Sequence, residues 1–337
     1  MISKSIISCR LCGSSDLDVI LDLGSQPLAN SLRSDLAQQQ EMIPLAITRC
    51  HECTTVQLTE TVSPEYLFRD YVWVTGTSQT ARDYSQSFYD NIVRHCRHSS
   101  LFTVEIASND GTFLQPFLRN KHGVLGIDPA QNLAKIAQAT GIPTLVEFFG
   151  LEIARQVVRD YGQADAIIAR NVLPHVPDPN DVIAGISHCL KYDGIGAIEF
   201  HCTDKIVREL HYDSIYHEHF FYHSLTSIRQ LLRRHSLRLF DVTESPISGG
   251  SLVAYFARSP RPESAALKEK LASEDECGLA TLSAWQEFAQ LSLAHGEKLK
   301  NMVEAEIQAG RRIIGYGASA RSSTLLNFFG IDSRPLL

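Results

Sequence analysis

The clearest hydrophobic pattern lies in the middle of the chain, where short apolar, β-branched runs alternate with stretches of helical periodicity. Seven of these runs predict strands, namely FTVEIA, GVLGID, PTLVEF, ADAIIAR, IGAIEF, LRLFDV and SLVAYFA. Strands that alternate with helices are typical of a parallel sheet covered by helices. The pattern predicts a doubly wound α/β domain over residues 67–259 with a final hairpin. In such a domain the ligand lies at the carboxyl ends of the strands.

The last segment, residues 260–337, is helix-rich up to Gly310. The run RRIIGYGASARSSTLLNFFG then predicts one strand, a turn and a helix. A single strand with one helix cannot bury both faces of the strand. We therefore expect an incomplete, helix-rich α/β C-terminal domain that is cut short of a full one.

Two pairs of cysteines mark the first segment. Cys9 and Cys12 form one CxxC motif, and Cys50 and Cys53 form a second. Each motif can turn two thiolates toward one cation, and two motifs supply the four sulfurs of a closed, structural zinc site. Metal binding would hold together a segment too small for its own core. The spacing predicts a zinc-binding module over residues 1–66, with four free thiols in a reducing cytosol as the alternative.

Composition and charge exclude several classes of protein. The 337 residues suffice for two or three domains, and the formal net charge of −7 argues against a nucleic acid partner. No apolar run approaches the roughly 20 residues needed to span a membrane. The stretch from Met1 to Ser8 is too short and too polar for a signal peptide. We expect a cytoplasmic protein without a membrane partner, of unspecified oligomeric state.

The candidate cofactor residues follow the first two predicted strands. The turn EIASNDG contains Glu105, Ala107, Asn109, Asp110 and Gly111. Small residues in this turn let the backbone approach a ligand, and the next helix begins there. The second strand ends in Asp128, roughly 20 residues after Glu105, where a carboxylate can accept hydrogen bonds from both ribose hydroxyls.

An acidic residue at this place fits either a dinucleotide or S-adenosylmethionine. The dinucleotide fingerprint GxGxxG lets pyrophosphate lie on the helix, and Ala107, Ser108 and Asn109 do not supply it. The sulfonium cofactor needs no such cradle, and Glu105 and Asp110 suit its cationic end. We therefore predict S-adenosylmethionine as the cofactor.

Two further strand ends add candidate side chains. Phe148 and Phe149 follow the third strand and could contact adenine, while Asn171 and His175 follow the fourth. The alternatives are that the two phenylalanines are plain core residues and that Asp128 is a surface carboxylate.

The motifs, taken together, carry a family resemblance over nearly the whole chain. With two CxxC motifs, EIASNDG, IYHEHF and GYGASARSSTLLNFFGI in this order, the sequence resembles the sugar C-methyltransferases of deoxysugar biosynthesis. The resemblance implies a Rossmann-like class I methyltransferase domain and methylation at C3 of a nucleotide-linked 4-keto-deoxyhexose. Two departures stand out. The family usually has glycine where Ala107 stands, and its C-terminal, nucleotide-binding-like domain continues beyond Leu337.

Methylation next to a ketone requires a base for the α-proton and a partner for the enolate oxygen. Histidine, with an unperturbed pKa of ~6.5, can take a proton at neutral pH. By the resemblance we assign His219 as the base, with Tyr216 and Glu218 beside it. Tyr71, in DYVWVTGTS, resembles a family tyrosine that reaches the same pocket.

Other functions fit parts of the sequence. The spacings His217-x-His219 and His219-x3-His223 also match metal ligands and would make the chain a metallohydrolase. That hypothesis lacks the further Asp or Glu ligands and leaves the cofactor motifs unexplained; we expect His223 on a helix surface. The chain could also methylate another biosynthetic carbon or oxygen acceptor, or be a truncated, non-catalytic protein that binds S-adenosylmethionine.

Overall fold

The computed structural model describes residues 2–31, 35, 39–247, 249–317 and 319–331. The chain forms two compact units, and each combines separate stretches of the sequence. The first unit contains Met1–Val62, Thr203–Tyr222 and Asp275–Leu337, and the second contains Ser63–Cys202 and His223–Glu274. The predicted domains at 1–66, 67–259 and 260–337 are sequential, and their bounds stay predictions.

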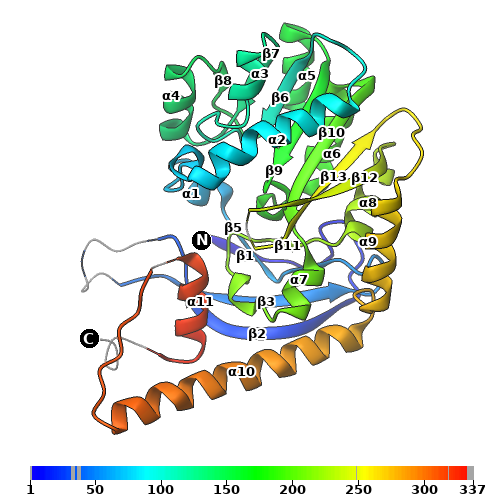
Figure 1. Ribbon diagram of the computed structural model, residues 1–337. Helices are drawn as coiled ribbons and strands as arrows, with labels where there is room; N and C mark the ends of the chain where they lie inside the picture. Colours follow the sequence, from blue (N-terminus) through cyan, green and yellow to red (C-terminus); the bar gives the residue numbers. More distant parts are fainter. Residues whose placement is uncertain (1, 32–34, 36–38, 248, 318, 332–337) are drawn as a thin grey trace. The chain divides into compact units, whose positions relative to one another are not determined.

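A seven-stranded sheet forms the centre of the second unit (Figure 1). Its strands are β6 (Phe102–Ile106), β7 (Gly123–Ile127), β8 (Thr144–Leu145), β9 (Ala164–Arg170), β10 (Leu190–His201), β12 (Arg238–Ser245) and β13 (Ser251–Ala257). They lie in the order β12-β13-β10-β9-β6-β7-β8. Strands β10, β9, β6, β7 and β8 are parallel, and β13 runs antiparallel to both β10 and β12. The predicted doubly wound sheet with a final hairpin is confirmed.

Helices connect and cover these strands. They are α1 (Pro64–Phe68), α2 (Gln79–His95), α3 (Gln115–Arg119), α4 (Gln131–Ala139), α5 (Leu151–Tyr161), α6 (Pro179–Cys189), α8 (Leu225–Arg234) and α9 (Ala265–Glu276), with 3-10 turns η1 (Thr75–Thr77) and η2 (Leu173–His175). Helix α2 packs on the sheet through Phe88 and Ile92, which join Phe117, Ile168 and Tyr255 in one buried cluster. Strand β9 is buried from Ala164 to Ala169, as expected for a strand covered on both faces.

All seven predicted strands form, although two of them differ in length. Strand β8 keeps only Thr144–Leu145 of the predicted run PTLVEF, and β10 begins at Leu190, before the predicted run IGAIEF. Strand β8 is the edge of the sheet and pairs only with β7. An edge strand lacks the second neighbour that extends pairing in the sheet interior.

The first unit contains an antiparallel sheet of four strands in the order β11-β4-β3-β2 and a separate two-stranded pair, β1-β5. The strands are β1 (Ser3–Ser5), β2 (Leu17–Pro27), β3 (Met42–Cys50), β4 (Val56–Leu58), β5 (Glu60–Val62) and β11 (Phe221–Tyr222). The helical elements are α7 (Thr203–Arg208), η3 (Tyr212–Ser214), α10 (Leu282–Gln308) and α11 (Ala320–Phe328). Helices α10 and α11 both pack against β2.

Helix α11 is tied closely to its neighbours in the first unit. A Cβ atom at Gly296 of α10 would collide with the ring of Phe329, the residue that follows α11. Glycine therefore allows α10 and the end of α11 to pack closely. The ring of Phe329 packs edge-on against Tyr212 of η3, whose hydroxyl lies 2.8 Å from His295 Nδ1 of α10. These contacts join α10, α11 and η3 in one layer.

The strand predicted at RRIIG does not form. Helix α10 ends at Gln308, and the described part of the segment that follows has only a single bridge residue, Ile313, before α11 begins. The side chains of Ile314 and Tyr316 are exposed (78% and 106%). A strand needs a neighbouring strand to pair its backbone groups, and this segment has none among the described residues.

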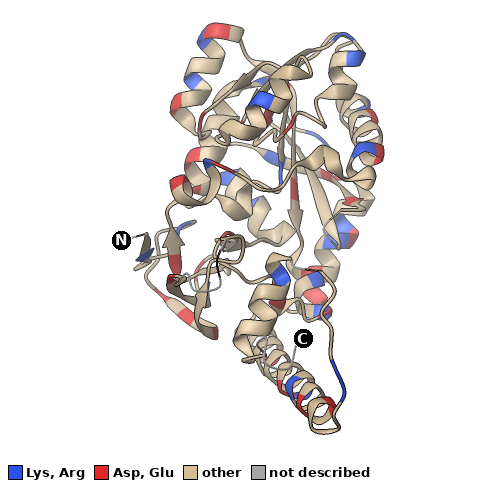
Figure 2. Cartoon of the chain, turned by 90° about the vertical axis from the view of Figure 1, so that its left-hand side faces the viewer, with Lys and Arg blue, Asp and Glu red and all other residues tan. Residues whose placement is uncertain are grey.

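Basic and acidic positions are interspersed along the ribbon in the view of Figure 2. No helix among the described residues has both the length and the apolar character required to cross a membrane.

Candidate active site

A cavity of about 580 Å³ opens at the carboxyl ends of the parallel strands in the second unit. This volume is typical of a small-molecule site. Nine of the candidate residues line it: Tyr71, Glu105, Ala107, Asn109, Asp128, Phe148, Phe149, Asn171 and His175. Asp110 and Gly111 were also predicted to bind cofactor and are not among its lining residues.

The turn after β6 brings the backbone against this cavity. Ala107 and Asn109 have positive φ angles of 52° and 54°, and Gly111 follows with 78°. Left-handed backbone is costly for alanine and easy for glycine. The fold therefore holds a strained turn at the mouth of the cavity, as functional sites often do.

Asp128 is fixed at the end of β7. Its two carboxylate oxygens accept hydrogen bonds from the backbone N–H groups of Asn109 (2.7 Å) and Ala130 (2.8 Å). The residue is 4% exposed, and burial raises the pKa of its carboxyl group despite these two bonds. Each oxygen keeps a lone pair, so the carboxylate can still accept from a ligand hydroxyl.

Asp110 has a different environment from the one predicted. Its carboxylate accepts hydrogen bonds from the backbone N–H of Gly76 (2.8 Å) and the hydroxyl of Thr112 (2.7 Å). The side chain of Asn109 also binds this loop, through Thr75 N–H (2.9 Å) and the Trp73 carbonyl (3.0 Å). These residues hold the segment after Tyr71 beside the cavity.

Glu105 lines the cavity and is buried. Burial raises the pKa of its carboxyl group to about 8, while the nearby Arg170 guanidinium opposes the increase. Its Oε2 has no hydrogen-bond partner among the described residues. At neutral pH much of this carboxyl group is therefore neutral until a cation approaches it.

Aromatic side chains also line the cavity. Phe148 and Phe149 line it, and the Arg69 guanidinium lies 4.7 Å from the ring centre of Phe148. Tyr71 also lines the cavity and is held by its backbone, which exchanges two hydrogen bonds with the Asn132 side chain. His175 also lines the cavity, edge-on to Phe68.

The four predicted zinc ligands meet in the first unit. The sulfur atoms of Cys9, Cys12, Cys50 and Cys53 all lie within 4.8 Å of one another, and two pairs are 3.5 Å apart. In a tetrahedral site with Zn–S bonds of about 2.3 Å the sulfurs are about 3.8 Å apart. The thiols are free of disulfide bonds, so the donor set and its spacing fit one zinc ion.

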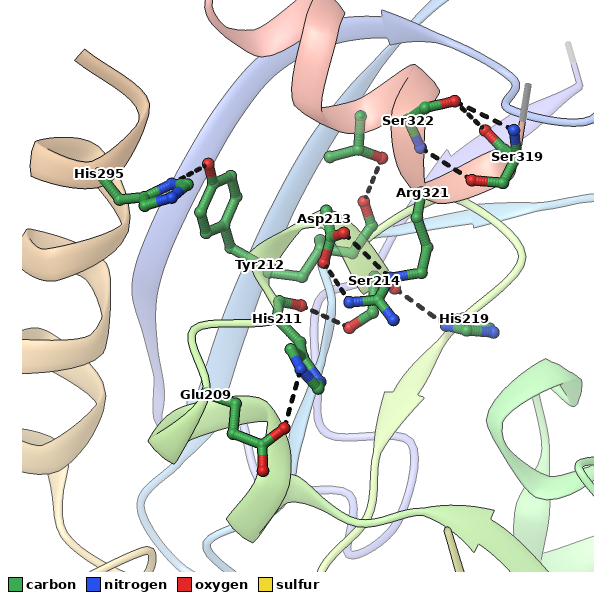
Figure 3. A network of polar contacts seen from close by, with 12 residues as sticks. Glu209, His211, Tyr212, Asp213, Ser214, His219, His295, Ser319, Arg321 and Ser322 are labelled. Atoms are coloured by element: carbon green, nitrogen blue, oxygen red, sulfur yellow. Dashed lines mark hydrogen bonds and ion pairs between the residues drawn. The ribbon is translucent and has the colours of Figure 1, made fainter. Parts of the chain in front are cut away.

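Tyr216, Glu218 and His219 belong to the first unit. Figure 3 shows His219 directed at the backbone of Ser214, with its Nδ1 2.9 Å from the Ser214 carbonyl oxygen. Its Nε2 lies 2.8 Å from the Tyr216 hydroxyl. Because a carbonyl oxygen only accepts, Nδ1 carries the hydrogen, and Nε2 is the nitrogen with the lone pair.

The neighbouring histidines have structural environments. The Nε2 of His217 donates to the carbonyl oxygens of Ile43 (3.2 Å) and Pro44 (3.3 Å). His223 is not on a helix surface as expected: it is 1% exposed, edge-on to Phe200, and burial lowers its pKa to about 4. The four cysteines form the one cluster of possible metal ligands found among the described residues. The metallohydrolase hypothesis gains no support.

Three residues near these groups were missed by the sequence analysis. Asn30 donates to Glu218 (2.6 Å), Arg321 pairs with Asp213, and Arg170 lines the cavity. Only Arg170 had a signal in the sequence, since it ends a predicted strand. The other two lie far along the chain from their partners.

Comparison with known proteins identifies three domains in order. Family models described as a zinc binding domain, a methyltransferase domain and a C-methyltransferase C-terminal domain match residues 9–68, 99–241 and 246–336. The C-methyltransferase NovU from Streptomyces niveus is 30% identical over 340 residues, which cover 99% of this chain and 81% of NovU.

Solved structures of methyltransferases match about half of the chain. Magnesium protoporphyrin IX methyltransferase from Synechocystis PCC 6803 is 14% identical and covers 53% of this chain and 79% of its own (TM-score 0.40). The methyltransferase CcbJ from Streptomyces caelestis is 9% identical and covers 53% and 89% (TM-score 0.41). The match to NovU over nearly the whole chain, with the zinc-binding and C-methyltransferase models, decides the assignment. The chain belongs to the zinc-binding C-methyltransferases that use S-adenosylmethionine.

Proposed function

We propose that the chain methylates the carbon next to a ketone, at C3 of a nucleotide-linked 4-keto-deoxyhexose, and that it does so in the cytoplasm. The observation that carries the proposal is the pair formed by His219 and Tyr216. Their rings lie 4.0 Å apart between centroids, and the tyrosine hydroxyl is within hydrogen-bond distance of His219 Nε2. A base and an oxyanion donor are the two groups that enolate formation requires.

The hydrogen bond from Nδ1 to the Ser214 carbonyl selects which nitrogen acts. With Nδ1 protonated, His219 Nε2 can remove the proton from the substrate carbon. The electrons of the broken C–H bond move to the ketone, whose oxygen becomes an enolate. For this step the Tyr216 hydroxyl turns from Nε2 to the ketone oxygen, which opens the Nε2 lone pair for the α-proton and places the O–H donor on the developing enolate.

When bound, S-adenosylmethionine would supply an electrophilic methyl group for the enolate carbon. The cavity in the second unit fits this cofactor because it combines a carboxylate at the end of β7, Asp128, with a buried carboxyl group in β6, Glu105. We propose ribose binding for the first and binding of the ammonium group for the second.

Glu218 is proposed to contact a substrate hydroxyl or amine. It is 4% exposed, and its Oε1 accepts a 2.6 Å hydrogen bond from the Asn30 side chain. This bond holds the carboxylate group in one orientation, so the position of its second oxygen is set as well. A fixed carboxylate can distinguish sugars by the position of a single polar group.

The proposal is tested with labelled S-adenosylmethionine and a panel of nucleotide-linked 4-ketosugars. We expect a single methyl transfer per sugar, which by reaction balance adds about 14 Da with unlabelled donor and correspondingly more with the label. In the absence of methyl donor, the α-proton of the same sugar should exchange with deuterated solvent. Methyl transfer to oxygen or to another carbon acceptor, with no exchange in any ketosugar, would overturn the proposal.

A further inference from the structure

Arg170 is the one arginine or lysine among the described residues that line the cavity. It is the last residue of β9, and its side chain is only 9% exposed. A cation in such a place is costly unless it is paired. The groups that pair with the Arg170 guanidinium therefore indicate which kind of ligand the cavity binds.

The protein holds one edge of this guanidinium firmly. Its Nε donates to Glu199 Oε2 at 2.6 Å, and Glu199 Oε1 in turn accepts from the Ser245 hydroxyl at 2.5 Å. The plane of the group packs on Phe113, with Cζ 3.1 Å from the ring centre, and Phe88 lies at 5.5 Å. The orientation of the fork is fixed before any ligand arrives.

The other edge is available. The two Nη groups of Arg170 have no hydrogen-bond partner among the described residues, and the residue lines the cavity. A planar guanidinium with two open N–H groups matches a carboxylate in a bidentate arrangement. The cavity therefore presents a preformed receptor for a carboxylate.

The order of the strands shows which end of the cofactor reaches it. In the register, Ile106 of β6 pairs with Ile127 of β7 on one side and with Ala169 of β9 on the other. Asp128 follows β7 and Arg170 ends β9, so they lie on opposite sides of the turn after β6. The inference rests on the proposed function: with ribose at Asp128 and adenine toward Phe148, the amino-acid end would extend across the turn toward Arg170.

We propose that Arg170 binds the carboxylate of the methionine end of S-adenosylmethionine through its two Nη groups. Glu105, in β6 between the two strand ends, receives the ammonium group of the same amino acid. The pair recognises an intact α-amino acid. It selects against nucleosides that lack the amino acid, such as 5′-methylthioadenosine, and against decarboxylated cofactor.

The test compares two ligands by calorimetry, S-adenosylhomocysteine and its decarboxylated analogue. The wild-type protein should bind the carboxylate-bearing ligand about 10- to 100-fold more tightly, the range of a bidentate charge-assisted contact. The analogue carries one more positive charge, so the acidic groups of the cavity favour it. A preference for the carboxylate thus requires a specific partner.

In Arg170→Gln the affinities for S-adenosylhomocysteine and for its decarboxylated analogue should differ by no more than about threefold. The affinity for the decarboxylated analogue should stay at the wild-type value. Because this change leaves Glu199 buried without a cation, the double variant Arg170→Gln, Glu199→Gln removes both charges and guards against misfolding. Arg159→Gln, at an exposed position on α5, is the matched control and should keep the wild-type preference. Equal binding of both ligands by the wild-type protein overturns the proposal. So does a folded double variant that keeps the preference, which would place the carboxylate at another group such as the N-terminus of α2.

Discussion

Ala107 has a backbone conformation that glycine adopts more readily, with φ at 52° in the turn that meets the cofactor cavity. A left-handed residue with a Cβ costs roughly 1–2 kcal/mol, part of which glycine loses again through its freedom in the unfolded chain. We expect Ala107→Gly to raise the free energy of unfolding by up to about 1 kcal/mol in urea titrations.

The control for this prediction is Ala166→Gly in β9. Ala166 is fully buried and has no positive φ angle, so its replacement should destabilise the protein. If both changes destabilise to the same extent, Ala107 is not strained.

The raised pKa of Glu105 should make the stability of the fold depend on pH. Its pKa, raised to about 8 by burial, lies above the value of 4.5 in the unfolded chain. Between these values the folded state binds more protons, so its stability falls as the pH rises from about 4.5 to 8.

If the cofactor ammonium ionises Glu105, binding at pH 7 releases protons. Calorimetry in buffers of different ionisation enthalpy should detect this release, and Glu105→Gln should abolish it. Proton uptake, or none in the wild type, contradicts the prediction.

His219→Gln should lower the rate of α-proton exchange by about 10²–10⁴, the usual effect of removing a general base. The fold and the affinity for cofactor should stay unchanged, because glutamine keeps much of the size and hydrogen bonding. Exchange is followed by NMR in deuterated solvent without methyl donor. His98→Gln, on an exposed loop side chain, is the control. Exchange at the wild-type rate in His219→Gln would assign the base to another group.

Helix α11 supports the loop that contains these catalytic candidates. Arg321 forms a bidentate ion pair with Asp213 (3.0 and 2.7 Å), and the Thr324 hydroxyl donates to the Ile215 carbonyl (2.7 Å). Ser214, between these two residues, provides the carbonyl that orients His219 (Figure 3). Helix α11, which lies about a hundred residues further along the chain, thus holds the backbone segment that orients the imidazole of His219.

We therefore expect Arg321→Ala to lower kcat several-fold and to change KM little. Stability should fall by no more than about 1 kcal/mol, since the pair is partly exposed. Arg311→Ala removes an exposed ion pair of the same unit and should leave kcat unchanged. Recovery of kcat in the charge-reversed pair Arg321→Asp, Asp213→Arg would confirm a positioning role, and an unchanged kcat in Arg321→Ala would exclude it.

The success of the sequence analysis differs between elements for physical reasons. The seven strands of the second unit could be predicted because most of them bury an apolar, β-branched run, a pattern contained in the run itself. The strand at RRIIG could not, since an apolar run forms a strand only beside another strand. Glu105 and Asp128 were found by the rule that parallel strands end at one edge. The side chain of Arg170 is oriented by Phe113 and Glu199, and that of His219 by the carbonyl of Ser214. These contacts join residues far apart or depend on the backbone conformation, so the spacing of residues in the sequence does not predict them.

At the scale of the whole molecule, zinc should stabilise the first unit selectively. Cys9 and Cys53 come from opposite ends of a stretch of more than forty residues, so their metal closes a long loop. Elemental analysis should give about one zinc per chain. Removal of the metal by a chelator should lower the unfolding temperature of the first unit and increase hydrogen exchange in β2 and β3.

Cofactor binding provides the internal control, because all cavity residues belong to the second unit. Calorimetric titration of the chelated protein with S-adenosylhomocysteine should give nearly the wild-type affinity. A protein that is free of zinc, fully folded and equally stable in the first unit would show that the four thiols are not a metal site.

The chain passes between the two units four times, at residues 62–63, 202–203, 222–223 and 274–275. During synthesis on a ribosome, the opening stretch of the first unit is therefore made long before the stretch from Asp275 that completes it. All four zinc ligands lie in that opening stretch. The metal can close it while the second unit is still emerging, and so protect the outer strands of the early sheet, β2 and β4, from wrong pairing until β11, α10 and α11 are made.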